Sequence, residues 1–302
     1  MNVAILLSTY NGKKFIHEFL ESLCEQQYKN FTLLVRDDGS SDDTVCIIEN
    51  FLDRLNIRIW KQENVGVAAS FLSLLDMAGG DFDIYMFADQ DDWWNGNKVL
   101  RCVKYFTGCK QELPVMYCAR LEIVNKDLKS IKLSNIPRKI HKYNALVENI
   151  ATGCTIGLNA RARGIVLSSR PSHVLMHDWW MYLVSSFFGY IFYDSEPVLL
   201  YRQHGGNTIG TAISWASEYR NRLRRFFVRN KKIGIFRVSD QASEFLNCYG
   251  SSLDSKDREI VELLTGKRSF LRRIRLSISP YFFRQRAVDS MILRILFLLG
   301  RY

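Results

Sequence analysis

Residues 83–94 read Asp-Ile-Tyr-Met-Phe-Ala-Asp-Gln-Asp-Asp-Trp-Trp. The apolar run from Ile84 to Ala88 predicts a buried strand, and three carboxylates follow it: Asp89, Asp91 and Asp92. The carboxyl end of a strand is where open α/β sheets bind their ligands. Because like charges this close repel each other, the cluster favours a bound divalent cation. The alternative is a solvated acidic turn.

Apolar runs alternate with helical patterns through the first 110 residues. Strands are expected at 3–7, 31–35, 57–60 and 84–88, with helices starting near Lys13, after Ser41, Asp42 or Asp43, after Gly66, and at Asn95 or Asn97. This alternation predicts a parallel sheet with right-handed crossovers between helices. Polar loops follow three of the strands, at 8–11, 37–40 and 89–92. Since the ends of parallel strands share one edge, these loops are expected to form one site.

The pattern changes after residue 110. We expect paired strands at 115–118 and 121–124, a polar loop at 130–143, a strand at 152–158 and a helix at 160–167. A helix opening at 176–180 and ending near 188, strands at 191–193 and 198–201, and a polar loop at 202–207 follow. From about residue 214 every segment has a helical pattern. The fold class is therefore α/β, with a mixed, mainly parallel sheet between helices and a C-terminal helical extension.

Composition narrows the class of protein. Hydrophobic residues make up 47% of the chain, which supports a packed core. The seven cysteines are scattered without a CxxC pair, so we expect reduced thiols and no zinc site or disulfide framework. The N-terminus lacks the basic and long apolar regions of a signal peptide, and no run of ~18 apolar residues predicts a membrane span. These features favour a cytoplasmic protein.

Several enzyme classes lack their motifs here. There is no GxGxxG after the first strand, no GxxxxGK[ST] and no GxSxG, and an EF-hand starting at Asp89 would need Gly at Trp94 and Glu at Leu100. Carboxylates at a sheet edge instead suit transfer from a nucleotide-activated donor, since a cation can stabilise the departing diphosphate. A later lone carboxylate, Asp178, could deprotonate an acceptor hydroxyl.

The ordered motifs resemble those of inverting family 2 glycosyltransferases with the GT-A fold. They are Ser8-Thr9-Tyr10-Asn11, Asp37-Asp38-Gly39-Ser40, Asn64-Val65-Gly66, Asp89-Gln90-Asp91-Asp92-Trp93-Trp94 and His177-Asp178-Trp179-Trp180. The resemblance covers about residues 1–210. The Asp-Gln-Asp-Asp form, with Thr152-Gly153-Cys154 and Tyr201-Arg202-Gln203-His204-Gly205, is similar to bacterial rhamnosyltransferases that build surface polysaccharides from dTDP-L-rhamnose.

The resemblance implies roles for individual residues. The nucleotide-sugar would contact Ser8, Thr9, Tyr10, Asn11, Asp38, Asn64, Gly66, Asp89 and Gln90. A divalent cation, Mg²⁺ or Mn²⁺, would be held by Asp91, with Asp89 and His204. Asp178 would be the catalytic base, and the acceptor would contact Trp179, Trp180 and Asp92. A single in-line displacement with inversion at the anomeric carbon is the implied mechanism.

Structural alternatives remain open for several of these residues. His204 could be a hydrogen-bonded loop histidine, and Asp178 a helix N-cap. Of Trp179 and Trp180, one is expected in the core, because adjacent helical residues cannot face the same cleft. Asp42 and Asp43 are interpreted as capping residues, and Asp194 and Glu196 as solvated turn charges.

The excess positive charge is confined to the C-terminal segment. Residues 1–216 contain 22 Lys/Arg and 23 Asp/Glu, whereas residues 217–302 contain 19 and 8. We therefore expect a catalytic domain at 1–212, with a nucleotide-binding half at 1–110 and an acceptor half at 111–212, and a basic amphipathic tail at 213–302. Such a tail can lie on an anionic membrane, here the inner face of the cell membrane. The alternative is helices packed on the catalytic domain, and no motif supports nucleic-acid binding.

Other functions stay open at this point. The donor could be a UDP-sugar carrying galactose, glucose or an N-acetylhexosamine. A sugar nucleotidylyltransferase would want a glycine-rich basic loop in place of residues 8–12. The chain could also be a carbohydrate-binding or assembly protein that has lost catalysis. The acceptor is expected to be a saccharide or a lipid-linked saccharide.

Overall fold

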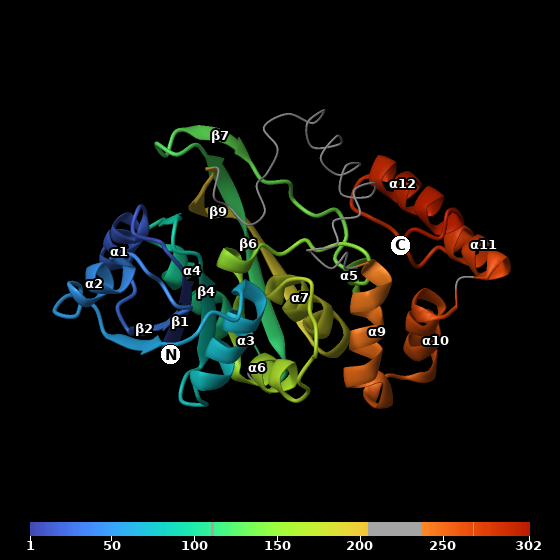
Figure 1. The fold of residues 1–302 in the computed structure, drawn as a ribbon, viewed down its shortest axis with the longest axis horizontal. Helices are drawn as coiled ribbons and strands as arrows, with labels where there is room; N and C mark the ends of the chain where they lie inside the picture. The colour runs from blue at the N-terminus through green and yellow to red at the C-terminus, as the bar shows by residue number, and fades with distance from the viewer. Residues whose placement is uncertain (110–111, 205–236, 268) are drawn as a thin grey trace. The chain divides into compact units, whose positions relative to one another are not determined.

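The computed structural model describes residues 1–109, 112–204, 237–267 and 269–302 (Figure 1). The chain forms two compact units. Unit 1 comprises Met1–Ile136, Ala151–Ser168 and Met176–His204, and unit 2 comprises Pro137–Ile150, Ser169–Leu175 and Gly205–Tyr302. Unit 2 thus includes two segments that we had expected within a catalytic domain at 1–212. The predicted helical start near residue 214 and the basic residues at 220–232 lie outside the described residues.

Unit 1 is built on a nine-stranded sheet with the order β3-β2-β1-β4-β8-β6-β9-β5, and β7 pairs with β6. The strands are β1 Val3–Thr9, β2 Phe31–Asp37, β3 Ile57–Lys61, β4 Ile84–Ala88, β5 Trp93–Trp94, β6 Val115–Val124, β7 Ser130–Leu133, β8 Gly157–Asn159 and β9 Tyr190–Arg202. β3, β2, β1 and β4 run parallel, as predicted. β8 is antiparallel to both β4 and β6, which makes the sheet mixed.

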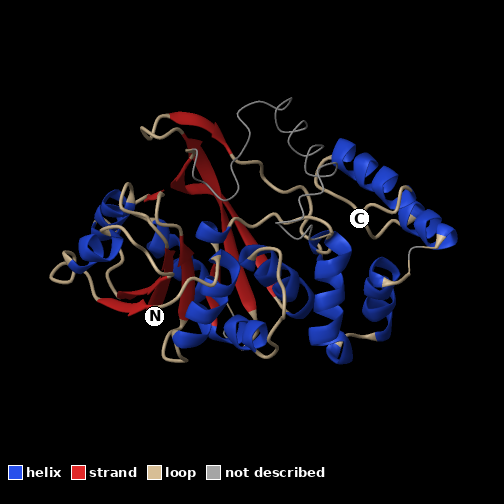
Figure 2. Cartoon of the chain, viewed as in Figure 1, coloured by secondary structure: helices blue, strands red, loops and turns tan. Residues whose placement is uncertain are grey.

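Helices cover both faces of this sheet (Figure 2). They are α1 Ile16–Cys24, α2 Thr44–Glu49, α3 Val67–Met77, α4 Lys98–Thr107, α6 Ala160–Leu167 and α7 His177–Phe188. The apolar stripes of α1, α2 and α4 pack against Val3, Ile5 and Leu7 of β1. Tyr85 and Phe87 point the other way, because successive strand residues face opposite sides, and they contact the layer of α3, α6 and α7.

Some predicted elements of the second half were wrong in their bounds. The expected pair of strands at 115–118 and 121–124 is one strand, β6, and the strands at 191–193 and 198–201 are one strand, β9. A shift in the β6–β9 register near Arg120 explains the apparent break, since a bulge interrupts the alternation. The polar segment 130–143 contains β7 and the short α5, and 152–158 contains a 3₁₀ turn, Gly153–Thr155, before β8.

Unit 2 joins the segment 137–150 to the C-terminal helices. These are α5 Lys142–Ala145, α9 Val238–Tyr249, a 3₁₀ turn at Gly250–Ser252, α10 Ser255–Thr265, α11 Phe270–Ile278 and α12 Ala287–Leu298. The buried carboxylate of Asp257 accepts hydrogen bonds from Lys142 Nζ (2.5 Å) and Tyr143 Oη (2.8 Å). Gln285 Oε1 accepts from the backbone of Arg138 at 2.8 Å. Among the described residues, none of the helices is long and apolar enough to cross a membrane.

Candidate active site

The loop after β1 is fastened to the loop after β4. The backbone N–H of Tyr10 donates to Gln90 Oε1 at 3.1 Å, and Gln90 Nε2 donates to the Tyr10 carbonyl at 3.1 Å. A Cβ on Gly12 would lie 2.2 Å from Gln90 Oε1, so glycine is required for this contact. Asn11 has a φ of 47° and its Oδ1 accepts from the Ser41 N–H at 2.9 Å. Two strand ends that are 80 residues apart therefore meet as predicted.

The loop after β2 is braced by its two aspartates. Asp37 accepts from Thr9 Oγ1 at 3.0 Å and from the Ser40 N–H at 2.9 Å. Asp38 forms a buried ion pair with Arg36 and accepts from the N–H groups of Val65 (2.9 Å) and Gly66 (3.0 Å). A carboxylate has about four acceptor positions, and Asp38, which is buried, uses three of them within the protein.

Four further residues that we expected to contact the nucleotide-sugar lie in or beside these loops. Tyr10 is half exposed, and Asn64 is exposed with its Oδ1 accepting from Gly66 N–H at 3.2 Å. Ser8 Oγ is hydrogen-bonded to Ser70 Oγ at 2.6 Å, whereas Thr9 is fully buried. Because the Thr9 side chain is buried against Asp37, only its backbone could face a ligand.

The acidic cluster after β4 contains carboxylates in three different surroundings. Asp91 is partly exposed, and its Oδ2 lies 2.7 Å from His204 Nε2. Asp92 is fully buried and accepts from the Arg202 N–H at 3.1 Å. Burial raises the pKa of Asp89 to about 7, and the negative charges of Asp91 and Asp178 add to this effect. Asp178 therefore lies close enough to Asp89 for their charges to interact, although 89 residues separate them.

The expectations for Asp92 and Trp180 need correction. Both side chains are fully buried, so neither can contact an acceptor saccharide in this structure. Burial raises the pKa of Asp92 well above its usual range, and the negative charges of Asp91 and Asp89 raise it further. Trp180 is the core member of the tryptophan pair, and Trp179 is partly exposed. The acceptor expectation is kept for Trp179 alone.

Asp178 occupies the first turn of α7, whose N-cap is Met176. The N-cap alternative for Asp178 is therefore wrong in this structure. Its neighbour His177 is buried and stacks on Phe71, with ring centroids 4.1 Å apart. A Cβ on Gly153 would lie 2.8 Å from His177 Nε2 and 3.6 Å from the Asp178 Cβ. Gly153 thus lets the 3₁₀ turn approach the start of α7.

Asp91 and His204 fit a hard divalent cation. Carboxylate oxygen and imidazole nitrogen are suitable ligands for Mn²⁺, and both groups are partly exposed and converge. Burial is the main reason for the raised pKa of Asp89, and the charges of Asp91 and Asp178 raise it further; a cation would offset these charges. A second set of candidate ligands, Asp89, Asp92 and Cys154, has ligand atoms within 4.8 Å of one another. It fits less well, because burial raises the pKa of the soft Cys154 thiol far above its usual range.

Two buried cations of the site were not predicted. Lys98 is fully buried, donates to the Cys154 carbonyl, and lies 3.3 Å from the centroid of the Trp94 ring. Burial lowers its pKa to about 7 despite the nearby carboxylates. Arg202 is also buried and donates to the Asp91 carbonyl at 2.8 Å and to Glu18 at 2.6 Å. The spacing of Lys98 four residues before buried Cys102 is a signal that could have placed it on the inner face.

Aspartate 194 also differs from expectation. It is buried and paired with Arg101 at 2.7 Å, and it accepts from Tyr117 Oη at 2.7 Å, so it is not a solvated turn charge. Glu196 is exposed, as expected. All seven cysteines are free thiols.

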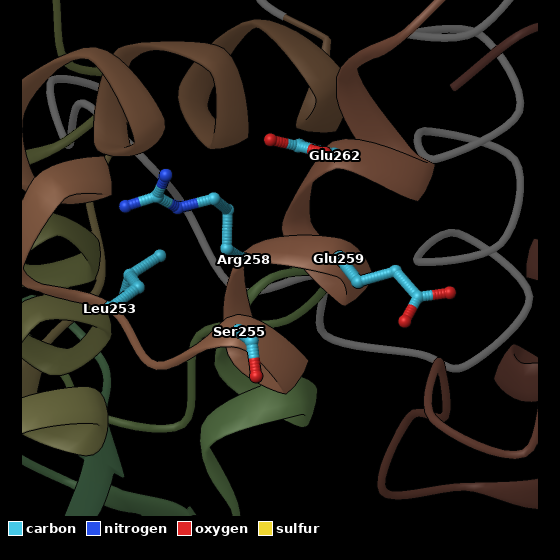
Figure 3. Close-up of a pocket in the computed structure, with 5 residues that line it drawn as sticks. All are labelled: Leu253, Ser255, Arg258, Glu259 and Glu262. Atoms are coloured by element: carbon cyan, nitrogen blue, oxygen red, sulfur yellow. The ribbon is translucent and has the colours of Figure 1, made fainter.

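A surface hollow of about 380 Å³ lies on unit 2 (Figure 3). It is lined by Leu253, Ser255, Arg258, Glu259 and Glu262. None of the residues expected to bind donor, metal or acceptor lines it, and it carries two carboxylates that would repel a diphosphate. It is therefore not the donor site.

Comparison with known proteins decides the family. The model for Glycosyl transferase family 2 matches residues 4–166, more than half of the chain. The chain belongs to this family. The match includes the loops after β1, β2 and β4, whose geometry is described above. The protein is therefore a glycosyltransferase, and the family expected from its sequence motifs is confirmed.

Sequence relatives support this assignment. The chain is 26% identical over 243 residues to a dTDP-rhamnosyl transferase, RfbG, of Shigella flexneri, covering 74% of this chain and 80% of that one. It is 32% identical over 152 residues to a UDP-Glc:alpha-D-GlcNAc-diphosphoundecaprenol beta-1,3-glucosyltransferase, WfgD, of Escherichia coli, covering 50% and 57%. Family 2 enzymes of polysaccharide synthesis are thus its relatives.

Solved structures confirm the GT-A fold. The structure of residues 1–349 of TarS from Staphylococcus aureus, in complex with UDP-GlcNAc, matches with a TM-score of 0.59 and 14% identity. That match covers 100% of this chain and 93% of TarS 1–349. A mannosyltransferase from Pyrobaculum calidifontis, in complex with GDP-Man and Mn²⁺, matches with a TM-score of 0.55 and 15% identity, covering 99% and 74%. At these identities the likeness extends to the fold only.

Proposed function

We propose that this glycosyltransferase transfers L-rhamnose from dTDP-L-rhamnose to a hydroxyl of a saccharide, with inversion at the anomeric carbon. The observation that carries the proposal is the convergence of Asp91 and His204 beside Asp89, whose pKa responds to Asp178. The two residues that we propose as metal ligands and the residue that we propose as general base thus belong to one cluster of charged groups. The choice of rhamnose rests on the relative from Shigella flexneri, which is named as a dTDP-rhamnosyl transferase.

Different residues would bind the base of the nucleotide and the metal ion. The β1 and β2 loops would hold the pyrimidine base, through the backbone near Ser8 and Tyr10 and through Asp38. Asp91 and His204, with Asp89 beside them, would hold Mg²⁺ or Mn²⁺. The bound cation would offset the charge of the departing nucleoside diphosphate.

Asp178 would act at the acceptor. Its carboxylate would take the proton of the acceptor hydroxyl while the oxygen forms a bond to the anomeric carbon. The bond between that carbon and the diphosphate oxygen breaks on the opposite face, so one displacement inverts the configuration. A retaining double displacement would want a second carboxylate as nucleophile close to the sugar, and we assign none. Trp179, partly exposed next to Asp178, offers a flat apolar face for the acceptor ring.

The second candidate function differs only in the donor. A UDP-sugar is favoured by the Escherichia coli relative, named as a UDP-Glc-dependent enzyme, and by the fold match to TarS with UDP-GlcNAc. Both donors carry a pyrimidine nucleoside diphosphate, so the same residues would bind either one. The ribose 2′-hydroxyl and the base methyl group distinguish them.

A lipid-linked saccharide at the inner face of the cell membrane is the proposed acceptor. The support is the Escherichia coli relative, which is named for an acceptor in which GlcNAc is linked to diphosphoundecaprenol. A panel of dTDP- and UDP-sugars, with Mn²⁺ or Mg²⁺ and a lipid-linked saccharide, tests donor and acceptor together by product mass. A rhamnose adduct is expected. Turnover with UDP-sugars alone would replace the rhamnosyl assignment by the second candidate.

A further inference from the structure

Helices α11 and α12 form a helical hairpin in unit 2 that is packed on one side. Leu276, Phe282, Leu293 and Phe297 are buried on its inner side. The rings of Phe282 and Phe297 lie 5.6 Å apart, and Arg294 Nη1 donates to the Ser277 carbonyl at 3.1 Å, which joins the two helices. The two helices contact each other near the C-terminus. The hairpin is therefore an ordered part of unit 2.

The other side of the hairpin is apolar and exposed. Eight large apolar side chains are between 48% and 74% exposed: Phe270, Leu271 and Ile278 on α11, and Val288, Met291, Ile295, Leu298 and Leu299 on or just after α12. On α12 the spacing of three, four and three residues from Val288 to Leu298 places them along one stripe. α12 is thus apolar on both faces, although only one is packed. Helices that are apolar all round are normally buried.

Positive charge surrounds this apolar stripe. Residues 267–302 contain nine Lys or Arg and a single acidic residue, so their net charge is +8. The acidic residue, Asp289, is buried, whereas Arg275, Arg294 and Arg301 are exposed. An apolar stripe flanked by arginines complements an anionic lipid surface, where acyl chains lie beneath negatively charged headgroups.

Two other partners fit less well. A second copy of this chain would bring two surfaces of net charge +8 together, which disfavours a symmetric contact on this stripe. A nucleic acid would meet mostly aliphatic side chains, because Phe270 is the one aromatic residue among the eight exposed ones, and bases stack on aromatic rings. The combination of charge and aliphatic surface therefore favours lipid.

We propose that the exposed stripe of α11 and α12 inserts into the headgroup region of an anionic membrane. Each helix would lie in the plane of the membrane surface, with its arginines at the headgroups and its apolar side chains beneath them. This contact goes beyond the sugar-transfer reaction and does not depend on it. It assigns membrane association to a defined hairpin whose eight side chains can be replaced without touching Asp91, Asp178 or His204.

The test measures binding of the full-length protein to lipid vesicles by flotation, without donor or acceptor. Wild-type protein should float with vesicles containing 30 mol% phosphatidylglycerol and far less with pure phosphatidylcholine, and 0.5 M NaCl should weaken the binding. The variant Met291→Gln, Ile295→Gln and Leu298→Gln should lower the partition coefficient at least tenfold. The variant Lys267→Gln and Arg275→Gln should lower it about tenfold on anionic vesicles, since each lost charge near the surface weakens binding severalfold.

The control substitutions are at exposed positions of the same residue classes in unit 1. Leu52→Gln with Leu113→Gln, and Arg58→Gln with Lys104→Gln, should bind vesicles as the wild type does. All variants should keep wild-type far-UV circular dichroism and donor turnover with a soluble acceptor. The proposal is overturned if wild-type protein does not float, or if the hairpin and control variants behave alike. It is also overturned if the apolar variant abolishes dimerisation in lipid-free solution, which would identify a second copy as the partner.

Discussion

Asp178 and His177 are adjacent in the first turn of α7 but have opposite surroundings. Asp178 is partly exposed and lies near Asp89, whereas His177 is buried between Phe71 and Phe87. Neither ring nitrogen of His177 has a hydrogen-bond partner within the described part of the chain. A helix turns about 100° per residue, so one of two neighbours can face the site while the other enters the core.

Replacing Asp178 by Asn should remove the general base and keep the shape of the site. We expect kcat to fall by about 10²–10⁴-fold, because this is the usual contribution of a positioned base. The Kd for the nucleoside diphosphate with Mn²⁺, measured by calorimetry, should stay within about twofold. Asp53→Asn, at an exposed position in unit 1, serves as the control. Near-normal kcat in Asp178→Asn would contradict the assignment.

The buried His177 should make the protein sensitive to acid. Burial lowers its pKa from 6.5 to about 3, so below pH 6.5 the unfolded chain binds a proton that the folded chain does not. The free energy of unfolding should therefore fall with decreasing pH, by about 1.4 kcal/mol per unit for this group. The free energy of unfolding, measured by urea titration at several pH values between 4 and 7, should depend less steeply on pH in His177→Gln than in the wild type. Parallel slopes in the two proteins would show that His177 titrates normally when folded.

At the scale of secondary structure, a buried carboxylate on β9 joins this strand to α4 and β6. Asp194 on β9 accepts hydrogen bonds from Arg101 on α4 and Tyr117 on β6. Burial alone would raise the pKa of Asp194, but these hydrogen bonds outweigh it and lower the pKa. The pair lies where the β6–β9 register shifts, so it fixes a strand that ordinary ladder bonds leave irregular.

Removing this charge should destabilise unit 1. We expect Asp194→Asn to cost about 2 kcal/mol, because it weakens the hydrogen bonds that the buried carboxylate accepts from Arg101 and Tyr117. The free energy of unfolding of the wild type and the variant is measured by chemical denaturation. Glu196→Gln, two residues along the same strand and exposed, should change it by less than about 0.5 kcal/mol. Equal effects of the two substitutions would be evidence against a structural role for the Asp194 pair.

At the scale of the whole molecule, ligand binding should be linked to stability. A ligand at about 100 times its Kd stabilises the folded state by about 2.7 kcal/mol. Nucleoside diphosphate with Mn²⁺ should therefore raise Tm by roughly 5–10 °C, given the size of unit 1. EDTA should abolish the metal-dependent part of this shift, and Asp91→Ala should lack it. A full shift in Asp91→Ala would place the metal elsewhere, with the buried Asp89, Asp92 and Cys154 set as the next candidate.

The amino-acid sequence by itself determined the local elements of the first half. Continuous apolar runs predicted β1 to β4, stripes of helical period predicted the helices between them, and the order of polar loops predicted that the strand ends meet. Those features could be predicted because each depends on residues that are neighbours along the chain or on a general rule of parallel sheets. The resemblance to the family motifs added the proposed roles of Asp38, Asp91 and Asp178, which no spacing alone assigns.

Which side chains are buried together depends on contacts that are visible in the folded molecule alone. Lys98, Arg202 and Asp194 belong to charged residue types that are usually exposed, yet each is buried by partners 56 to 184 residues away. The same holds for Asp92 and for residues 137–150, which join the C-terminal helices through Asp257 and Gln285. The physical reason is that the cost of burying a charge is set by contacts distant in sequence, whereas the pattern of strands and helices is set by contacts close to it.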